Sequence, residues 1–255
     1  MTSSNATTRF SSRVDDYIKY RPHYPVEVLD LLAAQCDLLP ESVIADVGSG
    51  TGILTRLFLE NGNPVMGVEP NADMREAAET YLADYARFTS LTGTAEATRL
   101  PAQSMDFVIA GQAFHWFDRQ KARAEFLRIL KPEGWVVLLW NDRRIDTTPF
   151  LRDYEALLQQ FGTDYQEINH KNVQSPDVFR GFFGGAFREA CFDNAQHFDF
   201  DGMMGRINSS SYVPAKDHPN YPLMAARARE IFDLHQQNGR ISFLYDTRVY
   251  YGRLL

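Results

Sequence analysis

The segment ADVGSGTG, residues 45–52, places three glycines at alternate positions directly behind an apolar run. Gly48, Gly50 and Gly52 permit a tight turn and leave bare backbone against which a ligand can lie. If a helix follows, its first N–H groups supply hydrogen-bond donors to that ligand. Asp46 stands two residues before the first glycine. An acid there suits a cationic or amino-bearing ligand and would repel a pyrophosphate.

A second acid, Glu69, ends the next apolar run, PVMGVEP. If the two apolar runs are neighbouring parallel strands, an acid at the end of the second can accept hydrogen bonds from both ribose hydroxyls of a nucleoside. A dinucleotide site requires Gly-x-Gly-x-x-Gly, whereas here the third glycine comes one position early and residue 53 is Ile53. No Gly-Lys-Ser/Thr follows, which excludes a P-loop. The spacing therefore favours an amino-acid-bearing nucleoside over a dinucleotide.

Other chemistries lack their characteristic spacings. The six histidines contain no His-x-x-x-His pair, and no Gly-x-Ser-x-Gly segment occurs. The two cysteines, Cys36 and Cys191, lie far apart in the chain. We therefore expect no metal site, and two buried thiols in a reducing compartment.

The elements that position these groups alternate between short apolar runs and segments with helical spacing. Short apolar runs are typical of parallel strands that are buried on both faces. Strands are expected at 42–48, 64–70, 87–94, 105–113 and 135–141, with helices at 52–62, 72–85 and 119–134. Gly62 is expected to end the first of these helices, and Pro132 with Gly134 the last. This alternation predicts a doubly wound parallel sheet.

The pattern changes on either side of this core. After Asn141 it predicts helices at 148–162 and 218–239, the second ending at Gly239, and strands at 190–200 and 240–255. Before the core, helices are expected within 10–20 and 25–36, the second opened by Pro25. The segment RGFFGGAF, residues 180–187, is interpreted either as a mobile aromatic lid or as a loop packed under the sheet.

Five segments occur in an order that resembles class I S-adenosylmethionine-dependent methyltransferases: DVGSGTG, GVEP, GTAEATRLP, MDFVIAGQAFHWFD and LKPEGWVVLLW. Within that family, YIKYRPHYP and HWFD are similar to the small-molecule branch, which includes trans-aconitate-type, methyltransferase type 11-like enzymes. The resemblance covers residues 10–141 well and the remainder loosely.

The expected fold class is therefore α/β: a doubly wound, mostly parallel, seven-stranded Rossmann-like sheet with helices on both faces. An N-terminal helical lid and a C-terminal helical insertion complete it. We expect residues 1–41 to form the lid and 42–145 the core that binds S-adenosyl-L-methionine. Residues 146–255 are expected to form the rest of the sheet and a substrate-binding cap in the same domain.

The resemblance implies a role for particular residues toward the cofactor. Asp46 would lie near the methionine amino group, and Gln112 would offer its backbone to the same amine. Glu69 would take the ribose hydroxyls, and Arg21 is a candidate for the cofactor carboxylate. Related sequences often have Asp where this chain has Thr94, so Glu96 or a backbone carbonyl is the alternative adenine contact. The other expected cofactor residues are Tyr17, Gly48, Ser49, Gly50, Gly52, Pro70, Met74 and Ala95.

The acceptor site is expected to follow the fourth strand and to continue in the C-terminal part. His115 is a candidate catalytic residue, as a base or as a ligand for an acid group, and the alternative is a structural histidine. Phe114 and Trp116 are candidate walls of the methyl pocket. A guanidinium group pairs with a carboxylate through two hydrogen bonds. The candidates for binding an anionic substrate are therefore Arg143, Arg144, Arg206 and Tyr212. The alternative is that they are surface charges.

Composition limits the partners. The net charge is -7, from 26 basic and 33 acidic residues, whereas domains that track a phosphate backbone are usually basic. No apolar h-region opens the chain, and no stretch approaches the roughly 18 apolar residues of a membrane span. We therefore expect a cytoplasmic protein, a monomer or a homodimer, with a small-molecule acceptor and with neither a nucleic-acid nor a membrane partner.

Three functions remain open at this point. The first is methyl transfer to a small molecule, including the carboxylate of an organic acid. The second is methyl transfer by the same fold to a larger acceptor, such as a quinone, a lipid or a macromolecule. The third is a catalytically silent cofactor-binding regulator.

Overall fold

The computed structural model describes residues 18–162, 175–210 and 212–255. Within this part of the chain, seven strands form one sheet in the order β3-β2-β1-β4-β5-β7-β6. The first five in this order are parallel, and β7 runs antiparallel to both of its neighbours. The predicted seven-stranded, mostly parallel sheet is confirmed. The strands are β1 (Ile44–Val47), β2 (Val65–Val68), β3 (Phe88–Leu91), β4 (Met105–Gly111), β5 (Leu130–Arg143), β6 (Arg188–Phe198) and β7 (Ile241–Gly252).

Helices cover both faces of the sheet. Buried side chains of α3 (Glu27–Cys36) and α4 (Ile53–Glu60) share one hydrophobic cluster with the sheet, together with Leu82 after α5 (Ala72–Tyr81). Buried side chains of α6 (Arg119–Ile129) and α8 (Pro176–Phe183) form a second cluster with the sheet. The sheet is therefore enclosed between two apolar layers, as expected for parallel strands.

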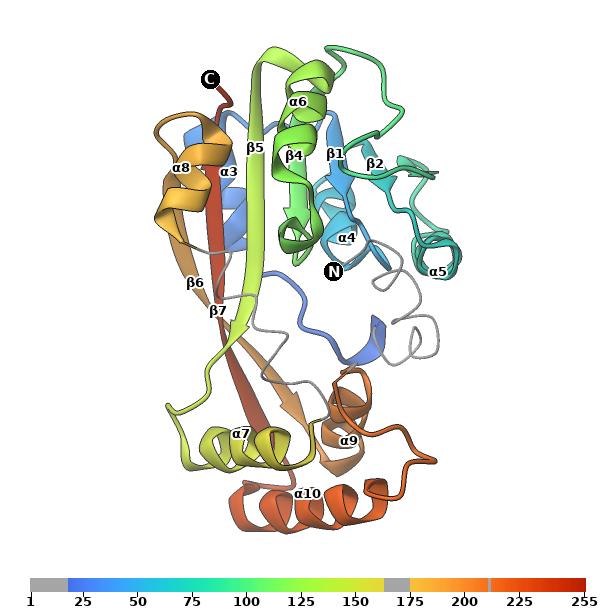
Figure 1. The fold of residues 1–255 in the computed structure, drawn as a ribbon, viewed down its shortest axis with the longest axis vertical. Helices are drawn as coiled ribbons and strands as arrows, with labels where there is room; N and C mark the ends of the chain where they lie inside the picture. The colour runs from blue at the N-terminus through green and yellow to red at the C-terminus, as the bar shows by residue number, and fades with distance from the viewer. Residues whose placement is uncertain (1–17, 163–174, 211) are drawn as a thin grey trace.

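Three further helices form a separate layer beyond the carboxyl ends of the parallel strands (Figure 1). We call α7 (Pro149–Phe161), α9 (Phe200–Asn208) and α10 (Tyr221–His235) the cap. The strands β5, β6 and β7 continue past the short central strands to reach it. The cap has a hydrophobic cluster of its own, which includes Leu151, Met203 and Phe232. His235 on α10 also contacts Asp153 on α7 at 2.6 Å.

Local signals set most helix boundaries. Each of five helices begins at a side chain that accepts a hydrogen bond from the backbone N–H three residues on, which satisfies a donor at the helix start. These capping residues are Asn71, Asp118, Thr148, Ser175 and Asp199. Gly62 has a φ of 96° and donates to the carbonyl of Leu59, close to the predicted end of α4.

Three helix ends differ from the prediction, and the first is that of α5, which ends at Tyr81 and not at Tyr85. α6 ends at Ile129, and Pro132 and Gly134 lie inside β5. The β4–β5 register is irregular there, with Met105 opposite Leu130 but Phe107 opposite Trp135, so Pro132 is not required to donate to the ladder. α10 ends at His235, and Gly239, with a φ of 76°, lies in the turn that leads into β7.

Helix α9 was not predicted from the sequence. Its residues include Gly202 and Gly205, and glycine has a low helix propensity. A Cβ atom on Gly205 would lie 2.2 Å from the ring of Tyr20, so glycine is required for this close approach. Tertiary packing therefore stabilises a helix that its own residues specify weakly.

The aromatic segment of residues 180–187 is neither a lid nor a loop along its first half, because residues 176–183 form α8. Phe179, Phe182 and Phe183 are at most 3% exposed. The ring of Phe179 stacks on Tyr250 of β7 at 4.2 Å and lies 5.9 Å from the ring of Trp140 of β5. The interpretation as a mobile lid is therefore wrong, whereas the packing against the sheet is confirmed, with a helix that ends at Gly184 in place of the expected loop.

We predict that Phe179→Ala lowers the free energy of unfolding by about 3–5 kcal/mol, because a fully buried ring is removed from a packed cluster. Leu223→Ala is the control, since Leu223 is 64% exposed and its change is expected to stay within about 0.5 kcal/mol. Urea unfolding of both variants measures the difference. Equal midpoints would show that α8 does not pack as described.

Candidate active site

The glycine turn after β1 approaches its neighbours closely. Gly48, Gly50 and Gly52 have φ values of 71°, 55° and 85°. A Cβ atom on Gly48 would lie 2.6 Å from Cβ of Ala113, and one on Gly52 would lie 2.6 Å from Leu82. On Gly50 the nearest atom would be the Met74 sulfur at 3.9 Å. Two glycines are therefore required by the protein's own packing, whereas Gly50 leaves room for a ligand.

The backbone of the turn is bound to the end of β2. The N–H groups of Gly48 and Ser49 donate to the carbonyl of Val68, and that of Gly50 donates to Oε2 of Glu69 at 3.0 Å. Oε1 of Glu69 accepts from the N–H of Asn71 at 2.9 Å. Burial raises the pKa of Glu69. Each carboxylate oxygen keeps a further lone pair, so this oriented group can accept from two hydroxyls.

Two residues that follow Glu69 lie beside this turn. Pro70 is exposed, and Met74 on α5 is 6% exposed with its sulfur next to the position of Gly50. The structure therefore brings the apolar Met74 against the turn.

Asp46 is fully buried at the end of β1. Its Oδ2 accepts from the hydroxyl of Thr55 at 2.6 Å, and within the described residues its Oδ1 accepts no hydrogen bond. Burial, opposed by the Thr55 hydrogen bond and reinforced by the charge of Glu69, raises the pKa of Asp46 to about 7. A buried acceptor without a donor is destabilising. A bound ammonium group would supply the donor and the opposite charge.

Gln112 marks the carboxyl end of β4. Its φ of 57° is unusual for a residue other than glycine. Its N–H donates to the carbonyl of Leu139, and its side-chain Nε2 donates to the carbonyl of Asn141 at 3.3 Å. Strained backbone of this kind often occurs at functional sites, where the surrounding contacts maintain it.

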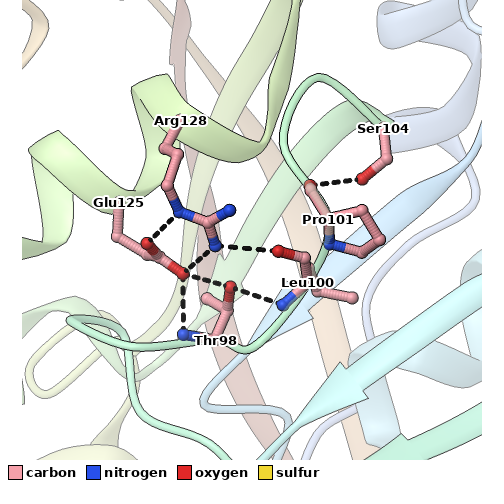
Figure 2. A network of polar contacts seen from close by, with 6 residues as sticks. All are labelled: Thr98, Leu100, Pro101, Ser104, Glu125 and Arg128. Atoms are coloured by element: carbon pink, nitrogen blue, oxygen red, sulfur yellow. Dashed lines mark hydrogen bonds and ion pairs between the residues drawn. The ribbon is translucent and has the colours of Figure 1, made fainter.

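A polar clamp on α6 holds the loop that contains the expected adenine contacts (Figure 2). Oε1 of Glu125 accepts from the N–H and the hydroxyl of Thr98, at 2.8 and 2.5 Å. Arg128 pairs with Glu125 at 2.7 Å and donates to the carbonyl of Leu100. The hydrogen bond from Arg128, opposed by burial and supported by Thr98, lowers the pKa of Glu125 to about 2. Sequence reasoning missed this clamp, whose only local signal is the Glu125–Arg128 spacing.

The clamp lies beside two of the predicted site residues. Ala95 is buried, and Oε1 of Glu96 accepts from the N–H of Asp118 at 2.8 Å. This bond joins the loop that contains the expected adenine contacts to the segment that carries His115. Thr94 is exposed.

The segment after β4 forms a short 3-10 helix, η2 (Phe114–Trp116). His115 is half-buried with its ring 4.8 Å from that of Trp116, which is 41% exposed. Phe114 is fully buried, and its ring lies 4.7 Å from Phe182. Phe114 therefore packs the hydrophobic core, which corrects the expectation that it walls the methyl pocket. The roles of His115 and Trp116 remain predictions.

The cap contains two of the predicted acceptor residues, Arg206 and Tyr212. Arg206 on α9 is 4% exposed and donates to the hydroxyls of Tyr245 at 3.2 Å and Ser210 at 3.0 Å. Among the described residues, no carboxylate lies within ion-pair distance of it. Although burial opposes the change, Arg206 and then Arg21 lower the pKa of Tyr212. Burial raises the pKa of Tyr154, a neighbour that the sequence did not single out, to about 12.

The other arginines already have protein partners. Arg143 pairs with Glu155 at 2.5 Å and lies 4.9 Å from the centre of the Tyr154 ring. Arg144 pairs with Asp246 and Asp193, and its role toward an acceptor stays a prediction. Arg21 donates to the carbonyl of Ser209 at 2.8 Å, so its observed contact is with the end of α9. Tyr17 lies outside the described residues.

Comparison with known proteins places this site in a family. The model for the family described as "Methyltransferase domain" matches residues 45–138. A methyltransferase-like protein of Schizosaccharomyces pombe is 27% identical over 205 residues, which are 80% of this chain and 78% of that protein. A methyltransferase of Mycobacterium tuberculosis is 38% identical over 136 residues, 52% of each chain. A solved structure from Anaeromyxobacter dehalogenans, assigned as a type II methyltransferase, has a TM-score of 0.68 at 21% identity and covers 92% of this chain and 99% of its own.

A parallel sheet with a glycine turn behind β1 and an acid after β2 is typical of nucleoside-binding α/β proteins. The family match spans this half of the sheet, and the relatives extend it into the cap. The matched domain, the methyltransferase relatives and the shared fold together support a class I S-adenosylmethionine-dependent methyltransferase. The trans-aconitate-type branch stays a prediction. Within the described residues, no helix has both the length and the apolar character needed to cross a bilayer.

We predict that Glu125→Gln destabilises the protein at neutral pH by about 1–2 kcal/mol, because a charge-assisted clamp on a buried threonine is weakened. The folded pKa lies below the ordinary value of 4.5, so Glu125 stabilises the fold above that pH and loses its contribution as the pH falls toward about 2. The difference between the unmodified protein and the variant should shrink as the pH falls below about 5.

Thermal unfolding between neutral and acid pH measures this effect. Glu230→Gln is a matched control, since Glu230 forms the same type of i,i+3 pair with Arg227 but is 64% exposed. A difference that stays constant down to acid pH would contradict the assignment.

Proposed function

We propose that this protein transfers the methyl group of S-adenosyl-L-methionine to the carboxylate of a small organic acid. The assignment of the cofactor rests on the buried Oδ1 of Asp46, which accepts no hydrogen bond from any described residue. This oxygen lies beside the glycine turn, where Gly50 leaves room for a ligand. When bound, the cofactor supplies an electrophilic methyl group on a sulfonium. The residues described here fit such a group, because they offer an acid for an amine and a second acid for a diol.

The protein's part is to bind, orient and exclude water. Asp46 would hold the amino group and Glu69 the ribose hydroxyls, while Met74 and Ala95 supply apolar contact for the adenine. The bonds of Gly50 and Asn71 to Glu69 keep its carboxylate in position before binding, which limits the ordering cost of the complex.

The cap supports an anionic acceptor. Arg206 is a buried guanidinium whose hydrogen-bond partners are neutral hydroxyls, and an anion would compensate its charge. A carboxylate is ionised at neutral pH and needs no general base, so His115 would bind or orient the acid group. The net charge of -7 favours a free small molecule over a nucleic acid as the acceptor.

We predict that the demethylated cofactor, S-adenosylhomocysteine, binds the protein in calorimetry and that NAD does not. Glu69→Ala should weaken that binding by about 1–3 kcal/mol, because the ribose hydroxyls lose their acceptor. Glu133→Ala is the control, since Glu133 is a largely exposed partner of Arg253. Unchanged affinity in Glu69→Ala would contradict the ribose assignment, and no heat with the unmodified protein would overturn the cofactor assignment.

We predict that a panel of organic acids, offered with methyl-labelled cofactor, yields a base-labile methyl ester with at least one member. Arg206→Gln should raise KM for that acid about tenfold or more, because a buried charge-assisted bond is lost. Its affinity for S-adenosylhomocysteine should stay within about twofold, which shows that the cofactor half is intact. Label that resists base in every product would contradict carboxylate methylation and would favour an amine or carbon acceptor.

A further inference from the structure

A short segment before α3 crosses from the cap to the sheet (Figure 1). We call residues 20–24 the strap. The side chain of Gln196 donates to the carbonyl of Tyr20, and the ring of Tyr20 lies against Gly205 of α9. At its other end, the hydroxyl of Tyr24 would be 2.5 Å from a Cβ atom on Gly111, the last residue of β4. The strap therefore lies between the carboxyl end of the sheet and the cap.

Two asparagines of the sheet hold the middle of the strap. Nδ2 of Asn141 donates to the carbonyls of Pro22 and His23, both at 3.3 Å. Nδ2 of Asn194 donates to the carbonyl of His23 at 2.7 Å. Asn141 lies on β5 and Asn194 on β6, more than a hundred residues along the chain from the strap.

Asn141 itself is fixed by the sheet. It is 8% exposed and lies opposite Thr247 of β7, which is fully buried. Oδ1 of Asn141 accepts from the Thr247 hydroxyl at 2.5 Å and from Nδ2 of Asn194 at 3.2 Å. With its oxygen held by these two donors, the orientation of the amide is determined, and its N–H groups point toward the strap.

The backbone of Asn141 contacts the other side of the site. Its carbonyl accepts from Nε2 of Gln112, the strained residue directly after β4 and three residues before His115. One residue therefore bonds both to the strap and to the loop that carries the candidate catalytic histidine. Its neighbours on the same two strands, Leu139 and Val249, are buried and apolar. A polar side chain here is not needed to build the core.

We propose that Asn141 is a positioning residue, which fixes the strap and Gln112 relative to one another at the methyl-transfer edge of the sheet. This inference rests on the proposed function, because it assigns the strap and Gln112 to the cofactor site. Asn141 acts through the backbone of Pro22 and His23 and through the side chain of Gln112.

The test uses Asn141→Asp in the full chain. Aspartate keeps an oxygen for Thr247 and Asn194 and removes the amide hydrogens that hold the strap. We expect amide hydrogen exchange of residues 20–24, measured by mass spectrometry without ligand, to accelerate about tenfold or more. We also expect Kd for S-adenosylhomocysteine to rise about tenfold, the loss expected for buried hydrogen bonds. Asn194→Ala removes the second donor and should change both quantities in the same direction by a smaller factor.

Val249→Ala is the control for a merely structural effect. It leaves a cavity in β7 and should lower Tm without accelerating exchange in the strap, and its Kd should stay within about twofold. Strap exchange that is unchanged in Asn141→Asp, or a Kd shift no larger than that of Val249→Ala, would overturn the proposal. If the unmodified protein does not bind S-adenosylhomocysteine, the proposed function fails, and the exchange comparison still decides whether Asn141 fixes the strap.

Discussion

The site depends on one continuous antiparallel ladder between β5 and β7. Pairing runs from Val136 opposite Gly252 to Arg143 opposite Tyr245, whereas β4 ends opposite Leu139. The ladder therefore extends past the central strands, with hydrogen-bonded pairs at alternate residues to keep its register. Because the cap helices follow or precede these long strands, the ladder determines where the cap lies relative to the glycine turn.

The two halves of the sheet contribute opposite chemistry. The parallel half supplies backbone N–H groups and the acids Asp46 and Glu69, which suit an amine and a diol. The antiparallel half supplies Arg206 and tyrosine hydroxyls, which suit an anion. In the proposed function, the groups for the methyl donor and those for the acceptor therefore come from different halves of the sheet.

Both halves contain buried polar groups that the described residues leave incompletely compensated. The open Oδ1 of Asp46 and the buried guanidinium of Arg206 each lower the stability of the protein without ligand. Such groups remain in place because the packing around them is well determined, as it is for the strained backbone of Gln112. Ligand groups of opposite charge would offset this loss of stability. Both features are therefore consistent with a ligand-binding site at this edge of the sheet.

The sequence by itself determined the parallel core, its helix starts and the cofactor turn. These features depend on neighbouring residues: the Gly48–Gly52 spacing, the acid after β2, and caps such as Asp118 act within a few positions of the chain. Only the tertiary structure decided the helical state of α9 and of residues 176–183, the core role of Phe114, and the ion-pair partners of Arg144. The same holds for the bonds between Glu125 and Thr98, 27 residues apart, and between Asn141 and Pro22, 119 residues apart. Periodicity cannot reveal such pairs, because they form only when the folded chain brings distant segments together, as the register of β5, β6 and β7 does for Asn141.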